Sequence, residues 1–199
     1  PPPRVTHFQP EGEQRFRSLD MAYARAYLLP ALRPLTDIKR GSFLLGYFCH
    51  LVTDNLWSAQ IGKPTMERYA AEFAADRDFI WEVKKDWYGL DFVYAHTHPD
   101  CLFWRVFMIS GYAQDWLDFL PAAAIQRNIT YIQDYYSELD EDKRERMQRS
   151  FVYLSPAEMD AFTSGAAQTL ERLIQRLEHE PVERLAGLDS ALELLGEAA

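Results

Sequence analysis

The chain has few of the features that mark disulfide-linked, membrane-spanning or nucleic-acid-binding proteins. Its two cysteines, Cys49 and Cys101, form no Cys-x-x-Cys pair and are too few for a disulfide framework. No apolar run reaches the length of a membrane span and no signal peptide is visible, so we expect no stable membrane insertion and a cytoplasmic location. The net charge of −9 is the opposite of a basic footprint, so we expect no long nucleic acid as a partner.

Strand patterns are lacking too, because no segment of five or more residues alternates convincingly between apolar and polar side chains. Almost everything after residue 12 has helical spacing instead. We predict helices over residues 12–35, 36–62, 63–87, 100–120, 121–139, 155–180 and 181–199. Residues 88–100 are ambiguous, and residues 139–150 are a charged turn or short helix. With 48% hydrophobic residues, the sequence predicts an all-α fold, a compact multi-helix bundle forming a single helical domain over residues 1–199.

Several helix boundaries can be predicted from capping and breaking residues. Thr36 or Asp37 is a plausible N-cap of the second helix, and Gly62 is its expected end. Pro30, within the predicted helix over residues 12–35, predicts a kink or an end of that helix. Ser155 and Glu158 have the spacing of a capping box at the start of the helix over 155–180.

The segment GYFCHLVTDNLW, residues 46–57, places a histidine and an aspartate four residues apart in apolar surroundings. On a helix, His50 and Asp54 share one face, where they could bind the same metal ion. A helix this apolar is expected to be buried nearly all round, and a buried carboxylate needs a partner or a metal. A hydrogen bond between His50 and Asp54, or a pair between Asp54 and a basic residue of another helix, is the alternative. We interpret Tyr47 and Trp57, one turn to either side, as core packing.

The other histidines carry less information. His7 stands alone in a proline-rich segment, which by itself indicates nothing. In YAHTHPD, residues 94–100, His96 and Asp100 are four apart, but the proline between them disfavours a regular helix, and we interpret this segment as a solvent-facing helix end. His179 lies at the charged end of a predicted helix, where exposure accounts for it.

The stretch FLLGYFCHLVTDNLW, residues 43–57, resembles the central motif of the zinc-dependent phospholipase C family, which is related to the S1/P1 nucleases. In that family a Gly-x-x-x-His-x-x-x-Asp helix supplies zinc ligands, and the matching residues here are Gly46, His50 and Asp54. The segment THF resembles the family segment in which a histidine precedes the first large helix and joins the same metal centre, and His7 is the matching residue. The smaller bacterial members of the family commonly have a Thr-Asp-x-x-Trp run that continues into a helix, and Thr53, Asp54 and Trp57 resemble it here.

The chain departs from the family pattern at two places. Family members carry an N-terminal histidine and a Pro-Asp segment upstream of the THF-like motif, and both supply metal ligands. PPPRVTHF, residues 1–8, looks like the continuation of such a segment, so we expect the N-terminal segment of the family fold to be missing. We identify no helix in this sequence that corresponds to the second family cluster, with its His-x-x-x-Glu motif.

The resemblance implies a metal-dependent, phospholipase C-like hydrolase of phosphoester bonds, with a bundle of the phospholipase C/P1 nuclease type. His7, His50 and Asp54 would be metal ligands, and Asp54 would also be catalytic as a bridging ligand or a base. Zinc is the implied cofactor, although a His/Asp set also accepts Mn, Fe, Co or Ni. The expected substrate is a small-molecule or lipid phosphoester, and the aromatic-rich helices are compatible with a homo-oligomer. The alternatives are a non-catalytic metal-binding protein with a degenerate site and a helical ligand-binding domain without metal.

Overall fold

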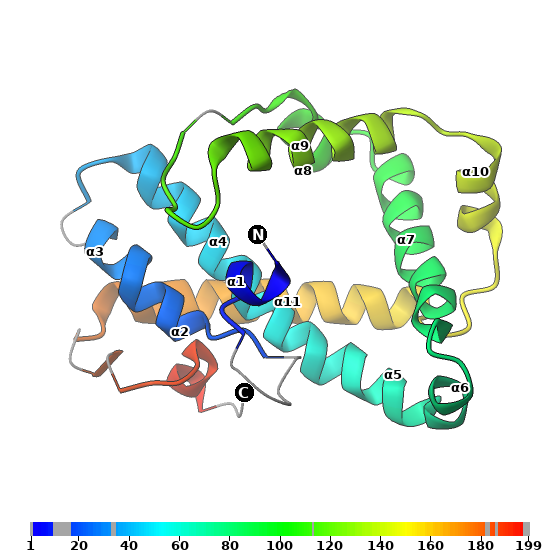
Figure 1. Ribbon diagram of the computed structural model, residues 1–199, viewed down its shortest axis with the longest axis horizontal. Coiled ribbons are helices and arrows are strands. Elements are labelled where there is room, and N and C mark those ends of the chain that lie inside the picture. Colours follow the sequence, from blue (N-terminus) through cyan, green and yellow to red (C-terminus); the bar gives the residue numbers. More distant parts are fainter. Residues whose placement is uncertain are drawn as a thin grey trace. The chain divides into compact units, whose positions relative to one another are not determined.

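The computed structural model describes residues 2–9, 17–32, 35–112, 114–181, 184–185 and 187–196. Over these residues the chain is helical and forms no β-strand, apart from one isolated bridge between Leu117 and Leu120, which confirms the all-α prediction (Figure 1). The helices of four or more residues are α1 (Pro3–Thr6), α2 (Asp20–Tyr23), η1 (Ala24–Leu28), α3 (Leu29–Leu32), α4 (Ile38–Trp57), η2 (Ser58–Gly62), α5 (Lys63–Arg68), α6 (Ala70–Ala75), α7 (Phe79–Thr97), α8 (Leu102–Arg105), α9 (Ala122–Ser137), α10 (Glu141–Gln148), α11 (Pro156–His179) and η4 (Ala191–Leu195). Among the described helices, none combines the length and the apolar character that a bilayer crossing requires.

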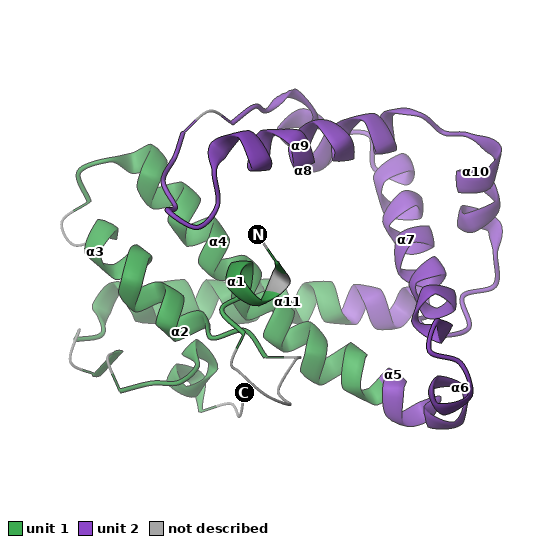
Figure 2. Ribbon diagram, in the orientation of Figure 1, with its two compact units in different colours: residues 1–64, 162–199 green, residues 65–161 purple. Residues whose placement is uncertain are grey.

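Contacts between residues group the chain into two compact units (Figure 2). Unit 1 contains residues 1–64 and 162–199, and unit 2 contains residues 65–161. The candidate site described below lies wholly within unit 1. The single helical domain over residues 1–199 stays a prediction, because contact groups do not by themselves separate folding units.

Helix α4 forms the centre of unit 1. Asp37 is its N-cap, as predicted, and its Oδ1 accepts a hydrogen bond from the backbone N–H of Arg40 at 3.0 Å. Helices α2, η1 and α3 pack against α4, and the α4 side chains Leu44, Phe48 and Leu51 are fully buried. The prediction that this helix is buried nearly all round is wrong. Neighbours cover part of its circumference only, and half of the His50 side chain is exposed on another side.

Two π-helical turns interrupt the helices of unit 1, and each precedes a proline. Turn η1 ends two residues before Pro30, and turn η2 ends two residues before Pro64. A proline cannot donate a hydrogen bond to the carbonyl four residues earlier, and in both cases that carbonyl lies inside the wider turn. Pro30 therefore sits within α3 and does not end the helix, although the π-helical turn before it marks the predicted irregularity.

The predicted helix end at Gly62 is wrong, because the chain continues directly from η2 into α5. A glycine ends a helix when it adopts the left-handed conformation, and Gly196 is the described glycine that does so, with φ of 73°. The first predicted helix also differs from expectation. It begins at Asp20, and residues 10–16 lie outside the described part of the chain.

In unit 2 the ambiguous residues 88–100 are mostly helical, because α7 runs on to Thr97. The predicted helix over 100–120 is wrong: α8 has one turn, a 3-10 turn follows at Phe107–Ile109, and residues 110–121 are irregular where described. Helix α10 packs on α7 at Gly89, where an added Cβ would lie 2.7 Å from the carbonyl oxygen of Arg146.

The capping box at the start of α11 is confirmed. The backbone N–H of Ser155 donates to Glu158 Oε2 at 2.9 Å, and the backbone N–H of Glu158 donates to Ser155 Oγ at 3.2 Å. The predicted last helix over 181–199 is reduced to the short 3-10 helix η4 in its described part, and Ser190 caps it.

Candidate metal centre

Two of the three predicted ligands come from one face of α4. His50 and Asp54 are four residues apart, so the helix itself brings their side chains together, with His50 Nε2 3.6 Å from Asp54 Oδ2. The Asp54 side chain is 37% exposed, so its carboxylate is only partly buried. This face of α4 is therefore open enough for an ion or a small molecule to reach it.

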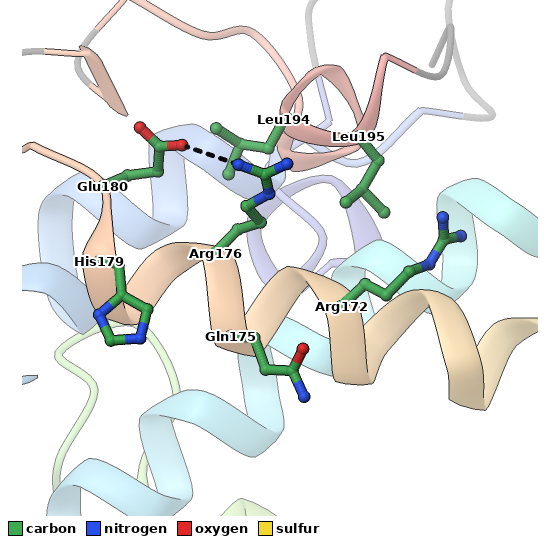
Figure 3. A pocket seen from close by; sticks show the side chains of 7 residues that line it. All are labelled: Arg172, Gln175, Arg176, His179, Glu180, Leu194 and Leu195. Carbon is green, nitrogen blue, oxygen red and sulfur yellow. Dashed lines mark ion pairs between the residues drawn. The ribbon is translucent and has the colours of Figure 1, made fainter.

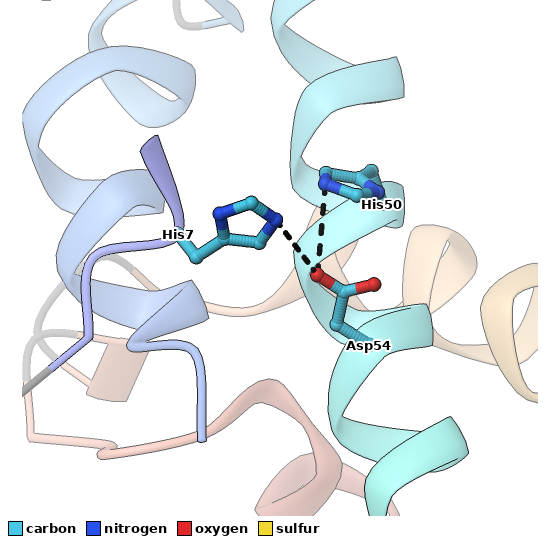
Figure 4. A group of neighbouring side chains, drawn as sticks. All are labelled: His7, His50 and Asp54. Atoms are coloured by element: carbon cyan, nitrogen blue, oxygen red, sulfur yellow. Dashed lines mark ion pairs between the residues drawn. The ribbon is translucent and has the colours of Figure 1, made fainter. Parts of the chain in front are cut away.

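The third predicted ligand reaches the same point from the N-terminal segment. His7 Nε2 lies 3.4 Å from Asp54 Oδ2, the same oxygen that faces His50 (Figure 4). One donor atom of each of the three residues lies within 4.8 Å of the others, and the two imidazole centroids are 5.3 Å apart. The structure thus brings together all three residues predicted as ligands, although 43 positions separate His7 from His50 (50 − 7 = 43).

Aromatic side chains hold the segment that carries His7. The Tyr47 hydroxyl of α4 donates a hydrogen bond of 2.6 Å to the backbone carbonyl of Thr6. The ring of Phe8 packs edge-on against Tyr23 and Tyr27, with centroids 5.5 and 6.1 Å away. The residues on both sides of His7 are therefore fixed to α4 and to the helices packed on it.

The backbone at Phe8 adopts an uncommon conformation. Its φ is 50°, in the left-handed region that a bulky side chain rarely occupies and that costs about 1–3 kcal/mol. The Phe8 carbonyl accepts a hydrogen bond of 3.2 Å from the backbone N–H of Leu19, and the N–H of Gln9 donates to the carbonyl of Arg4 at 3.1 Å. These bonds and the packing of the Phe8 ring offset the strain and turn the chain directly after His7.

Sequence reasoning missed the positioning role of Tyr47 and Phe8. We interpreted Tyr47 as core packing, and its ring does stack on Tyr23 at 5.0 Å, but its hydroxyl also binds the segment of His7. No local pattern marks either residue, because both contacts join segments far apart in the sequence. Trp57 packs on Phe162 with centroids 4.9 Å apart, as expected of a core side chain.

The electrostatics of the cluster follow from partial burial and from the mutual proximity of its groups. Partial burial lowers the pKa of His50; the Asp54 carboxylate opposes this shift, and nearby His7 adds to it. Partial burial raises the pKa of the Asp54 carboxyl, and both imidazoles oppose that shift. Thr6 Oγ1 lies 2.9 Å from His7 Nδ1, so it can accept a hydrogen bond from Nδ1–H, and in that tautomer the unprotonated Nε2 faces Asp54 and could bind a metal.

The spacing of the donor atoms fits a single ion. Zinc binds imidazole nitrogen and carboxylate oxygen at about 2.0–2.2 Å, so two ligands of a tetrahedral site stand about 3.3–3.6 Å apart. The observed 3.4 and 3.6 Å match this edge, and they exceed the about 2.7–3.2 Å of a good hydrogen bond. The three residues therefore fit a borderline divalent metal with at least one coordination position left for water or substrate.

The alternative partners of Asp54 are less well supported. Its ion pairs within the described residues are with His7 and His50, and the described residues place no lysine or arginine in an ion pair with it. His96 and His98 do not join this cluster, since His96 stacks on Phe92 in unit 2 and His98 follows the end of α7. In the part of the chain that the structure describes, His7, His50 and Asp54 form the one group of three or more side chains that could hold a metal ion.

The fold and the site together define an all-helical protein with a candidate two-histidine, one-carboxylate metal centre. Comparison of the chain with protein-family models, with curated proteins and with solved structures gives no match. The phospholipase C resemblance therefore stays a prediction that depends on the motif residues themselves.

Proposed function

We propose that His7, His50 and Asp54 bind a divalent transition metal, zinc in the first place, and that the protein is a metal-dependent hydrolase of phosphoester bonds of the phospholipase C type. The observation that carries the proposal is the convergence of the three donors: both imidazole Nε2 atoms lie 3.4 and 3.6 Å from the same oxygen of Asp54, and all three donor atoms lie within 4.8 Å of one another. The order of the motifs along the sequence and the all-helical fold also support this proposal.

Each of the three residues, His7, His50 and Asp54, would have a distinct role in the proposed hydrolysis. A bound zinc ion supplies Lewis acidity toward a phosphoryl oxygen and lowers the pKa of a coordinated water. His7 and His50 would hold the ion through Nε2, and Asp54 would hold it through Oδ2. The other carboxylate oxygen of Asp54 points away from His7 (Figure 4) and is free of the two ion pairs, so it can accept a proton.

The exposure of the cluster favours a working site over a sealed structural one. The three side chains are 30%, 50% and 37% exposed, in the order His7, His50, Asp54. Structural zinc sites are four-coordinate and closed, whereas catalytic zinc sites have three protein ligands and an open position. The observed set of three accessible donors corresponds to the second description.

Metal content is the first measurement that tests the proposal. The full-length protein, purified without a metal-affinity tag, is analysed by ICP mass spectrometry as wild type, His50→Ala and His7→Ala, with His98→Ala as the matched histidine control. We expect near-stoichiometric zinc or another transition metal in wild type and in the control, and loss of the metal in His50→Ala. A metal-free wild type that also takes up none on addition would overturn the proposal.

Hydrolysis of bis(p-nitrophenyl) phosphate separates a catalytic from a merely structural metal. We expect activity that chelation abolishes, that added zinc restores, and that Asp54→Asn lacks. A protein that binds metal, shows no hydrolysis of this or other phosphodiesters and unfolds on chelation would instead be the non-catalytic metal-binding protein.

A further inference from the structure

A cluster of tyrosine side chains adjoins one aspartate on the surface of unit 2. Asp91 and Tyr88 lie three residues apart on α7, so the helix brings them to one face. The Tyr136 hydroxyl of α9 donates a long hydrogen bond of 3.4 Å to Asp91 Oδ2. On α9, Tyr131 stacks on Tyr135 with ring centroids 6.0 Å apart. Burial raises the pKa of Tyr88, and the groups close to it add to this shift: Tyr135, Asp91 and Tyr131. The two helices thus place one carboxylate within a cluster of four phenol rings.

A buried phenylalanine holds the α9 part of this tyrosine cluster in place. Phe92 is fully buried, and its ring centroid lies 5.3 Å from that of Tyr135 and 4.8 Å from that of Tyr136. Tyr88 and Tyr131 are 37% and 65% exposed, so part of each ring is open to solvent. The tyrosine cluster therefore combines rings that are fixed by packing with ring surface that a ligand can contact.

The carboxylate of Asp91 has no counter-ion among the residues that the structure describes. No lysine, arginine or histidine of these residues forms an ion pair with it, and its side-chain hydrogen bond is the long one from Tyr136. Although Asp91 is exposed at the surface, desolvation by the surrounding protein raises the pKa of its carboxyl to about 6, and the hydrogen bond from Tyr136 opposes this shift. Above that pH the carboxylate is ionised, and its charge is not balanced by a neighbouring cation.

Two cations of α10 contact Tyr135, and each has an acidic partner of its own. Lys143 Nζ lies 4.8 Å from the centroid of the Tyr135 ring and 3.3 Å from Asp140 Oδ2. Arg146 Nη1 donates to the Tyr135 hydroxyl at 3.4 Å, and Arg146 Nη2 forms an ion pair of 2.6 Å with Asp142. Both positive charges are therefore balanced within α10 and its N-cap.

The groove of about 590 Å³ that α11 and η4 line in unit 1 shows the opposite arrangement (Figure 3). Its carboxylate, Glu180, forms ion pairs with Arg176 at 3.8 Å and with Arg184 at 3.1 Å. Protein side chains therefore balance the acidic charge of that groove. Asp91 has no such partner in the described part of the chain, so a cationic ligand is the group that can balance it.

We propose that the tyrosine cluster binds a small organic cation, a substituted ammonium group, with Asp91 as its counter-ion. The face of a tyrosine ring attracts a cation, and aromatic rings are the usual surroundings of alkylated ammonium groups in proteins. Such a ligand gains from both parts of the cluster, because its charge is attracted by the carboxylate and its methyl groups can pack on the exposed rings. The inference is independent of the proposed metal site, because the two clusters share no residue.

Titration of the full-length protein with tetramethylammonium chloride, followed by the NMR signals of the tyrosine rings, tests the proposal. The comparison ligands are tert-butanol, which has a similar shape and no charge, and sodium chloride at the same ionic strength. We expect saturable shifts with tetramethylammonium, no saturable shifts with either comparison ligand, and an affinity that falls with added salt. Absence of saturation with tetramethylammonium, or equal saturable shifts with tert-butanol or sodium, would overturn the proposal.

Variants locate the binding. Asp91→Asn should weaken tetramethylammonium binding about two- to fivefold, the size expected of an exposed ion pair. Tyr88→Ala should weaken it by a similar factor, and Tyr88→Phe, which keeps the ring, should retain most of the affinity. Two controls in unit 2 should bind as wild type does: Asp160→Asn, at an exposed aspartate, and Trp81→Ala, at an exposed ring that Lys84 Nζ already covers at 4.7 Å. Wild-type affinity in Asp91→Asn, with circular dichroism showing a folded variant, would overturn the proposal.

Discussion

The hydroxyl of Tyr47 offers the sharpest test of how His7 is held for metal binding. Its hydrogen bond of 2.6 Å to the carbonyl of Thr6 joins α4 to the residue next to His7. Burial, with a further contribution from Asp54, raises the pKa of Tyr47 to about 12, so the phenol remains a donor at neutral pH. Tyr47→Phe removes this hydrogen bond and leaves the ring in place.

The expected effect follows from the strength of one such bond. A neutral hydrogen bond contributes about 0.5–1.5 kcal/mol, and each 1.4 kcal/mol corresponds to about a tenfold change in affinity. Without the bond, the segment that carries His7 is held less firmly, and metal binding must order it. Tyr47→Phe should therefore weaken zinc affinity about two- to tenfold, as measured by competition with a chromogenic chelator.

A double-mutant cycle decides whether Tyr47 acts through His7. In a His7→Ala background the histidine is gone, so Tyr47→Phe should have almost no further effect on zinc affinity. Tyr131→Phe, an exposed tyrosine of unit 2, is the control and should leave the affinity unchanged. Equal losses from Tyr47→Phe in the wild-type and His7→Ala backgrounds would refute the reasoning, because they would show an effect that does not pass through His7.

Three further predictions concern buried groups and close contacts. Asn55→Ala removes three buried hydrogen bonds of 2.8 Å, one of them to Asp20. It should therefore lower the free energy of unfolding, measured by urea denaturation, by about 3–5 kcal/mol. A loss below about 1 kcal/mol would contradict this prediction. Burial raises the pKa of Asp20, so as the pH falls the Asp20 carboxylate is protonated at a higher pH in the folded state than in the unfolded state. The stabilising contribution is complete below the unfolded value of about 3.9 and is lost as the pH rises through the raised pKa. Relative to Asp20→Asn, wild type should therefore gain stability as the pH is lowered, and a difference that does not vary with pH would argue against the shift. Gly89→Ala should destabilise the fold by about 1–3 kcal/mol, because the added Cβ would meet the carbonyl of Arg146. Gly165→Ala should instead stabilise the fold by about 0.5–1 kcal/mol, because the space at its Cβ is open. Thermal unfolding of the two variants checks both signs.

Local rules predicted those parts of the fold that depend on a few adjacent residues. The Asp37 cap and the Ser155–Glu158 capping box are confirmed because both depend only on side chains and backbone groups no more than three residues apart. The predicted end at Gly62 failed because a glycine permits a left-handed turn without requiring one. The irregular stretch over 110–121, where described, escaped prediction because its apolar residues were compatible with a helix.

In the candidate site too, contacts between nearby residues could be predicted from the sequence, and contacts between distant segments could not be predicted from local patterns. The neighbourhood of His50 and Asp54 follows from helix geometry and could be predicted from spacing alone. The exposure of His50 could not be predicted from spacing, because it depends on which sides of α4 the other helices cover. The approach of His7 to Asp54 joins segments more than 40 residues apart, and only the family resemblance predicted it (54 − 7 = 47).

The way His7 is held bears on whether a metal at this site would serve folding or chemistry. In a zinc-dependent fold, the ligands lie on segments that have little else to order them, and removing the metal unfolds the chain. Here two of the proposed ligands lie on a long capped helix, and the third is fixed by the Tyr47 hydroxyl and the packed ring of Phe8, none of which involves a metal. The strained backbone at Phe8 persists only because those contacts hold it, which is the arrangement expected where ligands are preorganised for function. Chelation should therefore remove the proposed phosphodiesterase activity while leaving the helical content of the protein in place, and this separation distinguishes a catalytic centre from a structural one.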